Sequence, residues 1–340
     1  MTPANRTTGP VRVGVLGAAR IVPLALVQPA AETPDIQISA IAARDPERAR
    51  RFAAKYGIAR VHASYAALLE DKEIDAVYIP LPNGLHGQWT IAALRAGKHV
   101  LCEKPFTANA EEAAAVAEVA RRTKLVTMEA FHYRYHALMR RIAEIIASGE
   151  LGEIRRIETA MCIPLLLLKD IRWDLRLAGG TLMDVGCYTI NLLRTLAGAE
   201  PVVRSARAKL LKPDIDRFVQ AEFEFPDGRT GSITASMLSH RLMAASACVI
   251  GSQGTLRVRN PFVPQYLHRL KIEAGARQRV ERVERRPSTY AAQLQSFASA
   301  VLRGTPFPTN VDEAIANMRV IDACYAAAGL PRREPAGARV

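Results

Sequence analysis

The chain of 340 residues is too long for one simple hydrophobic core, so two domains are expected. Its 49% hydrophobic and 23% charged residues are typical of a globular protein in water. No apolar run approaches the ~20 residues that a membrane span needs, and the N-terminus lacks an apolar signal core. We therefore expect a cytoplasmic protein with no membrane partner. The five scattered cysteines show no CxxC spacing, which argues against a disulfide framework and against a metal site.

A formal net charge of +13 raises the question of nucleic-acid binding. The arginines are spread along the chain, and the one dense run, residues 277–286, alternates in a way that indicates a strand with a solvated face. No recognition motif accompanies the charge, so no nucleic-acid partner is expected. The positive field suits solubility and an anionic small ligand.

Strands and helices alternate through the first half of the chain. A strand from Val11 breaks at Gly17 into a helix, and the helix 45–57 carries Asp45 as its N-cap and Pro46 at its first position. Further strands are predicted at residues 36–44, 75–80, 99–105 and 125–131, with helices at 88–96 and 110–122. This alternation predicts an α/β domain with a doubly wound Rossmann sheet over residues 11–135. Ligands of such sheets bind beyond the carboxyl ends of the strands.

The second half, residues 136–330, predicts an α+β domain with a largely antiparallel open sheet. A helix at 139–152 precedes hairpins at 217–238, turning at Asp227-Gly228, and at 247–260. Helices at 290–302 and 311–328 close the chain, and they could pack back on the first domain. The first ten residues and the tail from Pro331 are expected to be disordered.

The turn after the first strand is a candidate nucleotide site. A dinucleotide fingerprint reads G-x-G-x-x-G, and here only its first glycine is present, as Gly17. Gly17 permits a tight turn, Ala19 is small enough for a pyrophosphate to approach, and the amides of the helix start would hold that anion. The candidate cofactor contacts in this turn are Gly17, Ala18, Ala19, Arg20 and Ile21. A plain strand-to-helix turn of any doubly wound fold is the alternative.

The end of the second strand indicates which dinucleotide is bound. NAD sites usually place a carboxylate there, but Ala42 and Ala43 offer none, and Arg44 offers a fork of donors suited to a phosphate. The 2′-phosphate of NADP would therefore meet Arg44, helped by Arg20 or Arg48. The alternative is that Arg44 pairs with a neighbouring acid at the surface, in which case NAD is also used.

Two further motifs carry candidate chemistry. In Glu103-Lys104-Pro105 a lysine follows a parallel strand and would point into the ligand crevice, although a surface pair with Glu103 is the alternative. In "GGTLMDVGCY", residues 179–188, Asp184 and Tyr188 are one helical turn apart and would share a face. The glycine pair before them lets the backbone approach something closely. Otherwise Asp184 caps a helix and Tyr188 packs at a domain interface.

These motifs, with "PLPNGLH" and "MEAFHYRYH" between them, form an ordered series that resembles the Gfo/Idh/MocA oxidoreductase family over residues 11–330. The series is most similar to the branch of dimeric dihydrodiol dehydrogenases and NADP-dependent xylose dehydrogenases. It departs from that branch at His132, at Ala137, where proline is usual, and at Ala178, where a third glycine is common.

The resemblance implies an oxidoreductase that moves a hydride between a nicotinamide and a hydroxyl-bearing carbon of a polyol, cyclic sugar or vicinal diol. It implies that Lys104, Asp184 and Tyr188 meet above the nicotinamide, with Tyr188 as proton carrier. The chemistry is consistent, because a free phenol with a pKa of ~10 needs a nearby ammonium to act as a base near neutrality. Further cofactor contacts are expected from Leu81, Pro82, Asn83, His86, Glu103 and Pro105.

Substrate contacts are expected from Arg134, Trp173 and Tyr188, although burial in the core is the alternative for Trp173. A different class of function is a nucleotide-sensing regulator, as in a yeast galactose-pathway repressor related to this family. The presence of Lys104, Asp184 and Tyr188 together argues against a sensor, which needs no proton carrier. We also expect a homodimer or higher homo-oligomer joined through the antiparallel sheet, whose outer apolar positions would otherwise face water.

Overall fold

The computed structural model describes residues 9–239 and 243–337. The chain forms two compact units: unit 1 comprises Met1–Arg134 with Tyr290–Ile315, and unit 2 comprises Tyr135–Thr289 with Ala316–Val340. Among the described residues, none of the helices combines the length and apolar character of a membrane span.

Unit 1 contains a six-stranded sheet in the order β3-β2-β1-β4-β5-β6, with every strand pair parallel. The strands are β1 (Val11–Leu16), β2 (Ile36–Ala42), β3 (Arg60–His62), β4 (Ala76–Ile79), β5 (His99–Cys102) and β6 (Thr127–Glu129). All four residues of β4 are buried, as expected for a central strand covered on both faces. The predicted doubly wound parallel sheet is confirmed.

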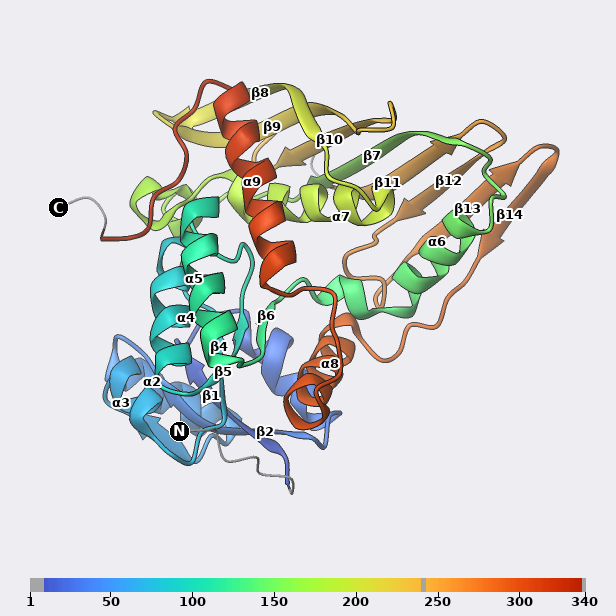
Figure 1. The fold of residues 1–340 in the computed structure, drawn as a ribbon. Coiled ribbons are helices and arrows are strands. Elements are labelled where there is room, and N and C mark those ends of the chain that lie inside the picture. The colour runs from blue at the N-terminus through green and yellow to red at the C-terminus, as the bar shows by residue number, and fades with distance from the viewer. Residues whose placement is uncertain (1–8, 240–242, 338–340) are drawn as a thin grey trace. The chain divides into compact units, whose positions relative to one another are not determined.

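Helices connect these strands, as Figure 1 shows for α4 and α5. The connecting elements are a π-helical turn (Pro23–Val27), α1 (Gln28–Ala31), α2 (Pro46–Tyr56), α3 (Tyr65–Glu70), α4 (His86–Arg95) and α5 (Ala110–Thr123). Helix α8 (Thr289–Arg303) lies much later in the chain, and its residues from Tyr290 also belong to unit 1. The predicted cap of α2 is confirmed, because the Asp45 carboxylate accepts hydrogen bonds from the backbone N–H groups of Glu47 and Arg48. Gly57, at φ 68°, ends the helix in the left-handed conformation.

Unit 2 contains an eight-stranded sheet in the order β14-β13-β12-β11-β7-β10-β9-β8. Among its described residues, β7 and β10 are the only strands that pair in parallel. The strands are β7 (Ile154–Cys162), β8 (Val202–Lys212), β9 (Ile215–Glu224), β10 (Thr230–Ser236), β11 (Ala244–Gly251), β12 (Gly254–Arg259), β13 (Arg269–Ala274) and β14 (Arg277–Glu281). Both predicted hairpins, β9–β10 and β11–β12, are present, and the sheet is largely antiparallel as expected.

The helices of unit 2 are α6 (Ala137–Ala147), α7 (Cys187–Ala197) and most of α9 (Val311–Ala327). Helix α7 packs on β7 and β10 and covers one face of the sheet (Figure 1). Short 3₁₀ turns at Ile171–Trp173 and Leu175–Leu177 and a π-helical turn at Leu182–Gly186 precede α7.

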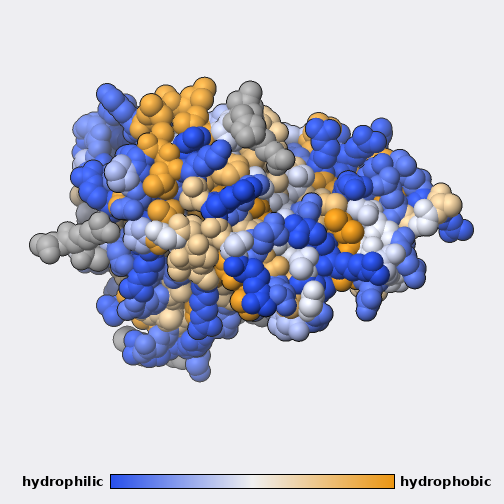
Figure 2. Space-filling model, turned by 90° about the horizontal axis from the view of Figure 1, so that it is seen from above, coloured by the Kyte–Doolittle hydropathy of each residue, from blue (hydrophilic) through white to orange (hydrophobic). Residues whose placement is uncertain are grey.

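The uncovered face of this sheet is largely polar, whereas apolar side chains were expected there; Val202 and Val280 are large apolar residues exposed on it. In β9 the residues Ala221 and Phe223 are buried, whereas Glu222 and Glu224 point to the other face. Glu222 pairs with Arg156 of β7 at 3.0 Å, and a similar pair, Arg257–Glu273, joins β12 to β13. Strict alternation placed the charged residues together on one side. Figure 2 likewise shows hydrophilic residues over much of the visible surface and hydrophobic residues in separate patches.

The expected disorder of the C-terminal tail is wrong for Pro331–Gly337. The side chain of Arg333 is fully buried and forms a 2.7 Å ion pair with Asp216. The polar, proline-containing sequence of the tail is typical of disorder. The tail is ordered by its contact with Asp216, a buried carboxylate that is distant in the sequence, so no local pattern indicates it. Of the first ten residues, 1–8 lie outside the described part of the chain, as do residues 338–340.

Candidate active site

The turn after β1 has the geometry that the sequence predicts for a nucleotide site. Gly17 adopts φ +119°, and a Cβ there would lie 3.1 Å from the Leu81 side chain. Its N–H donates to the Ala42 carbonyl at 2.7 Å, which joins the ends of β1 and β2. The helical turn that follows leaves Ala18, Ala19, Arg20 and Ile21 at the carboxyl end of the sheet. The left-handed φ favours glycine here, and a Cβ would in addition require a small shift of the Leu81 side chain.

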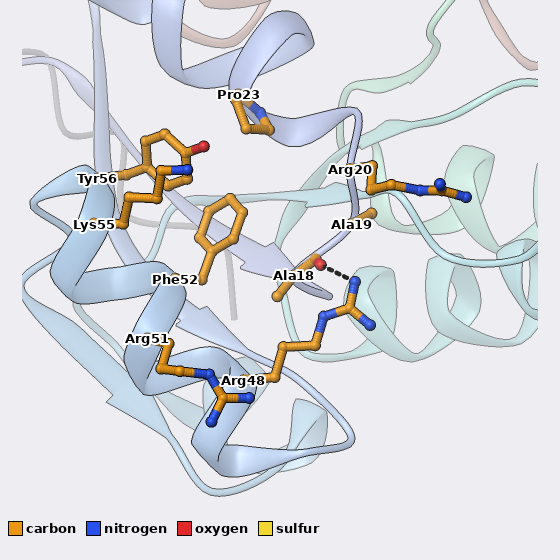
Figure 3. Close-up of a pocket in the computed structure, with 9 residues that line it drawn as sticks. All are labelled: Ala18, Ala19, Arg20, Pro23, Arg48, Arg51, Phe52, Lys55 and Tyr56. Atoms are coloured by element: carbon orange, nitrogen blue, oxygen red, sulfur yellow. Dashed lines mark hydrogen bonds between the residues drawn. The ribbon is translucent and has the colours of Figure 1, made fainter.

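A pocket of about 370 Å³ opens beside this turn (Figure 3). Its lining combines the β1 turn with one side of α2 and comprises Ala18, Ala19, Arg20, Pro23, Arg48, Arg51, Phe52, Lys55 and Tyr56. Arg48 reaches across and donates to the Ala18 carbonyl at 2.6 Å, which Figure 3 marks with a dashed line. Four cations in one pocket give it a positive field that suits an anion.

Arg44 follows β2 and is exposed. The acids that could have paired with it are engaged elsewhere: Asp45 caps α2, and Glu47 forms an ion pair with Arg50. Within the described residues Arg44 has no ion pair. The surface pairing considered as the alternative therefore does not occur, and the guanidinium is available to an anionic ligand.

His86 joins two of the predicted cofactor loops. One ring nitrogen lies 2.7 Å from the Pro105 carbonyl oxygen and the other 2.8 Å from that of Leu81. The ring is fully buried, and burial lowers its pKa to about 4. A neutral ring carries one N–H and donates to one of these carbonyls, so the buried His86 packs between the loop Leu81–Asn83 and the segment Glu103–Pro105 rather than facing a substrate.

Lys104 follows β5 and is half-buried, and its peptide bond to Pro105 is cis. Its charge lies close enough to His86 and His132 to lower the pKa of both rings, although burial is the larger cause for each. The carboxylate of the preceding residue, Glu103, accepts a 2.7 Å hydrogen bond from the Tyr78 hydroxyl. These contacts place an ammonium group at the carboxyl end of the parallel sheet.

Arg134 lies after β6 and is mostly buried. Its Nη1 atom is 3.8 Å from a Glu313 carboxylate oxygen and has no hydrogen-bond partner in the described part of the chain. The neighbouring His132 ring stacks on Tyr290 with centroids 3.9 Å apart. Burial lowers the pKa of His132 to about 3, so this ring is neutral near pH 7.

In unit 2 the glycine pair begins the turn that carries Asp184 and Tyr188. The turn from Leu182 to Gly186 is π-helical, and Tyr188 lies in the first turn of α7. Residues four apart remain on nearly the same side of such a helix. A π-helical turn of this kind often marks a functional site.

Asp184 is held by Arg172, which the sequence analysis did not single out. The Arg172 Nε atom lies 3.1 Å from a carboxylate oxygen of Asp184, and Arg172 also pairs with Asp170 at 3.1 Å. The two carboxylates raise the pKa of Arg172, with Asp184 as the largest cause. The position of Arg172 just before the glycine pair was the only available signal.

The Tyr188 ring is 7% exposed and meets Phe262 edge-on, with centroids 5.4 Å apart. Trp173 is 1% exposed and lies in the core of unit 2, where its indole nitrogen lacks a hydrogen-bond partner among the described residues. The structure thus brings Asp184, Tyr188 and Arg172 to one helix start. The roles of all these side chains in binding and catalysis stay predictions.

Comparison with known proteins identifies the family of the chain. A model of the oxidoreductase family with an NAD-binding Rossmann fold matches residues 11–131, and a GFO/IDH/MocA C-terminal domain model matches residues 139–257. The NADP-dependent D-xylose 1-dehydrogenase 2 of Haloferax volcanii is 36% identical over 318 residues, covering 93% of this chain and 96% of that protein. The mouse trans-1,2-dihydrobenzene-1,2-diol dehydrogenase is 32% identical over 232 residues, covering 68% and 69% of the two chains.

Among solved structures, the 3-ketoreductase KijD10 of Actinomadura kijaniata, in complex with NADP and TDP-benzene, superposes with a TM-score of 0.86. It is 31% identical and covers 94% of this chain and 98% of its own. The prediction of a nicotinamide dinucleotide cofactor is confirmed by the family model, which describes an NAD-binding fold. The matches cover both halves of the chain, and the chain belongs to the Gfo/Idh/MocA family of oxidoreductases.

Proposed function

We propose that this oxidoreductase is an NADP-preferring dehydrogenase or reductase that acts on a CH–OH group of a polyol, cyclic sugar or vicinal diol. The names of its relatives support this substrate class, since they include a xylose dehydrogenase, a dihydrodiol dehydrogenase and a 3-ketoreductase. The observation that carries the proposal is the acid–phenol pair of Asp184 and Tyr188, presented by a π-helical turn in a chain that matches this family over both halves.

The residues of unit 1 fit a dinucleotide. Gly17 leaves space where a Cβ would contact Leu81, so a pyrophosphate can approach the backbone. The exposed guanidinium of Arg44, with the basic pocket beside it, suits the 2′-phosphate of NADP. The fixed loops Leu81–Asn83 and Glu103–Pro105 would hold the nicotinamide half.

A bound nicotinamide dinucleotide supplies the hydride acceptor or donor. In the oxidation direction, Tyr188 takes the proton from the substrate hydroxyl while the carbon loses its hydride, and in the reduction direction Tyr188 returns that proton to the oxygen. An ammonium group close to a phenol lowers its pKa, which is the role proposed for Lys104. Lys104 and Tyr188 belong to different units, so their joint action rests on the family resemblance.

Asp184 is proposed to orient the substrate hydroxyl or the lysine. Its ion pair with Arg172, 3.1 Å between Nε and a carboxylate oxygen, would hold the Asp184 side chain in one orientation. Arg134 is proposed to supply donors in the substrate region, whereas the burial of Trp173 supports the alternative that it is a core residue.

The proposed domains are a dinucleotide-binding domain at residues 11–135 and a substrate and dimerisation domain at 136–330. A homodimer or higher oligomer through the open face of the unit 2 sheet also stays a prediction. Since that face is polar, the contact would consist of salt bridges and hydrogen bonds rather than apolar packing. Light scattering at micromolar concentration tests it, and a monomer would contradict it.

The test of function is a panel of aldoses, cyclic polyols, vicinal diols and their keto forms, followed by nicotinamide absorbance with NADP and with NAD. Steady turnover with at least one sugar-like member is expected. Tight NADP binding without turnover across the panel would contradict the enzyme and support the nucleotide-sensing regulator instead.

A further inference from the structure

A buried ion pair lies directly behind the turn that carries Asp184 and Tyr188. Arg333, from the C-terminal tail, and Asp216, at the start of β9, are both fully buried, and Arg333 Nη2 lies 2.7 Å from the Asp216 carboxylate. Tyr325 of α9 stacks on the guanidinium at 4.1 Å and donates its hydroxyl to Asp216 at 3.1 Å. These groups come from three distant parts of the chain.

This cluster holds the backbone on which the Asp184 turn begins. The Asp216 carboxylate accepts the N–H of Leu182 at 2.7 Å, so it satisfies one of the free amides of the helix start. Arg333 donates its Nε–H to the Gly179 carbonyl at 2.8 Å. The peptide from Gly179 to Leu182 is therefore fixed from both sides by one ion pair.

Gly180 explains why the cluster can approach so closely. Its φ of +130° disfavours any other residue, and a Cβ there would overlap the Asp216 carboxylate and lie 2.9 Å from Arg333 Nη2. The Gly180 carbonyl in turn accepts the N–H of Asp184 at 3.0 Å. Any displacement of the cluster is thus transmitted through two hydrogen bonds to the Asp184 backbone.

We propose that Arg333 and Asp216 are positioning residues that fix the orientation of Asp184 and Tyr188, so that the C-terminal tail is part of the catalytic apparatus. The proposal rests on the proposed function of Asp184 and Tyr188. Burial raises the pKa of Asp216 while the Arg333 guanidinium opposes that shift, and the three donors around the carboxylate favour its ionised form. Separate nitrogens of the planar Arg333 guanidinium bind Gly179 and Asp216, an arrangement that suits a rigid fork of donors better than the single ammonium nitrogen of lysine.

The test compares four proteins: wild type, a chain that ends at Gly337, a chain that ends at Leu330, and Arg333→Lys. The chain ending at Gly337 keeps Arg333 and is the matched control. In the other two variants, hydrogen exchange of the amides at 181–188 is expected to be faster by about tenfold or more, with exchange in α5 of unit 1 unchanged. With a substrate from the panel, kcat should fall by up to about a hundredfold, while the Kd of NADP stays as in the wild type.

The Arg333→Lys variant keeps a buried positive charge, so it separates positioning from folding if the shorter chain is unstable. Exchange at 181–188 as slow in Arg333→Lys as in the wild type would overturn the proposal. A uniform increase in exchange over all of unit 2 in this variant, or an unchanged kcat, would also overturn it. The exchange measurement requires no substrate. It therefore tests the positioning role of Arg333 separately from the proposed function. A fully active Tyr188→Phe variant would contradict the proposed chemistry but would leave the exchange result valid.

Discussion

Gly180 and Asp216 lie in direct contact, with the Gly180 Cα facing the buried carboxylate and leaving no room for a Cβ. The relationship explains why a glycine stands immediately before the turn with Asp184. The sequence predicted that the backbone approaches something closely at this point, and the partner is another part of the same unit.

Gly180→Ala is expected to destabilise unit 2 strongly. The added methyl group must displace a buried, hydrogen-bonded carboxylate, and alanine is disfavoured at φ +130°. We expect a loss of about 3 kcal/mol or more in the free energy of unfolding, measured by denaturant titration. Gly275→Ala is the control: φ is +55° and a Cβ would meet nothing within 4 Å, so only about 1–2 kcal/mol of backbone strain is expected. Equal losses in the two variants would contradict the proposed overlap.

Tyr188→Phe is expected to lower kcat by about two to four orders of magnitude, the size of a general acid–base contribution, with the Kd of NADP unchanged. The substitution removes only the hydroxyl, and the edge-on contact with Phe262 is kept. Tyr266→Phe, at an exposed tyrosine of the same unit, is the control and should retain full turnover. Near-normal kcat in Tyr188→Phe would remove the phenol from the mechanism.

Lys104→Met is expected to reduce kcat and to shift the limb of the pH–rate profile that reports ionisation of the phenol towards higher pH, which is the rising limb in the oxidation direction. Without the ammonium, the phenol would ionise nearer to its ordinary pKa of ~10. The pH dependence of kcat/KM measures this, with Lys72→Met at an exposed lysine of unit 1 as the control. A lower kcat with an unshifted profile would show that Lys104 acts only in binding.

Much of the fold could be predicted because its signals are local. The Asp45-Pro46 cap and the Asp227-Gly228 turn each depend on a few adjacent residues, and both lie where expected. The edge strand β8 escaped prediction because most of its residues are exposed, so it shows no buried alternation. The three-residue strand β3 is too short to give a pattern.

The candidate site likewise contains residues that local motifs mark and residues that depend on distant contacts. Residue types and order pointed to Lys104, Asp184 and Tyr188, because short motifs carry that information. The π-helical turn and the supporting partners could not be predicted, since they depend on packing between distant segments. Arg333 is 117 residues from Asp216 in the chain, and nothing local marks it as a buried residue.

The free energy of unfolding is expected to fall as the pH drops below about 6.5. His99 Nδ1 accepts the N–H of Val126 at 3.0 Å, and burial lowers the pKa of His99 to about 4. The unfolded chain therefore binds a proton near pH 6.5 that the folded chain resists, and stability present above that pH is lost as the pH approaches 4. Each such histidine contributes a slope of about 1.4 kcal/mol per pH unit.

His99→Asn tests this assignment, because the Asn Oδ1 atom can accept the same hydrogen bond but does not titrate. Between pH 6.5 and 4 the free energy of unfolding of the variant should fall less steeply than that of the wild type. The difference in slope should correspond to about one proton fewer taken up on unfolding. His86 and His132, with pKa values lowered to about 4 and about 3, sustain the remaining slope. An unchanged slope in His99→Asn would show that His99 stays neutral in both states or charged in both.

Arg44→Ala is expected to reduce the preference for NADP over NAD. Arg44 is exposed after β2, where no carboxylate is available for the ribose hydroxyls of NAD, and the neighbouring acids Asp45 and Glu47 are engaged in α2. A charge-assisted contact to the 2′-phosphate is worth about 1.5–3 kcal/mol, which corresponds to about ten- to hundredfold discrimination. The change should appear in kcat/KM for NADP, whereas kcat/KM for NAD should change little.

Arg50→Ala is the matched control, because Arg50 is an arginine of the adjacent helix α2 that pairs with Glu47 at the surface. It should leave both cofactor efficiencies unchanged. If Arg44→Ala retains the wild-type ratio of kcat/KM for NADP to kcat/KM for NAD, the 2′-phosphate is held by the pocket arginines. Arg48→Ala should then remove the preference, since Arg48 already contacts the β1 turn through the Ala18 carbonyl. Equal kcat/KM for NAD and NADP in the wild type would refute NADP preference altogether, because a site built on Arg44 without a neighbouring carboxylate stabilises the phosphorylated cofactor selectively.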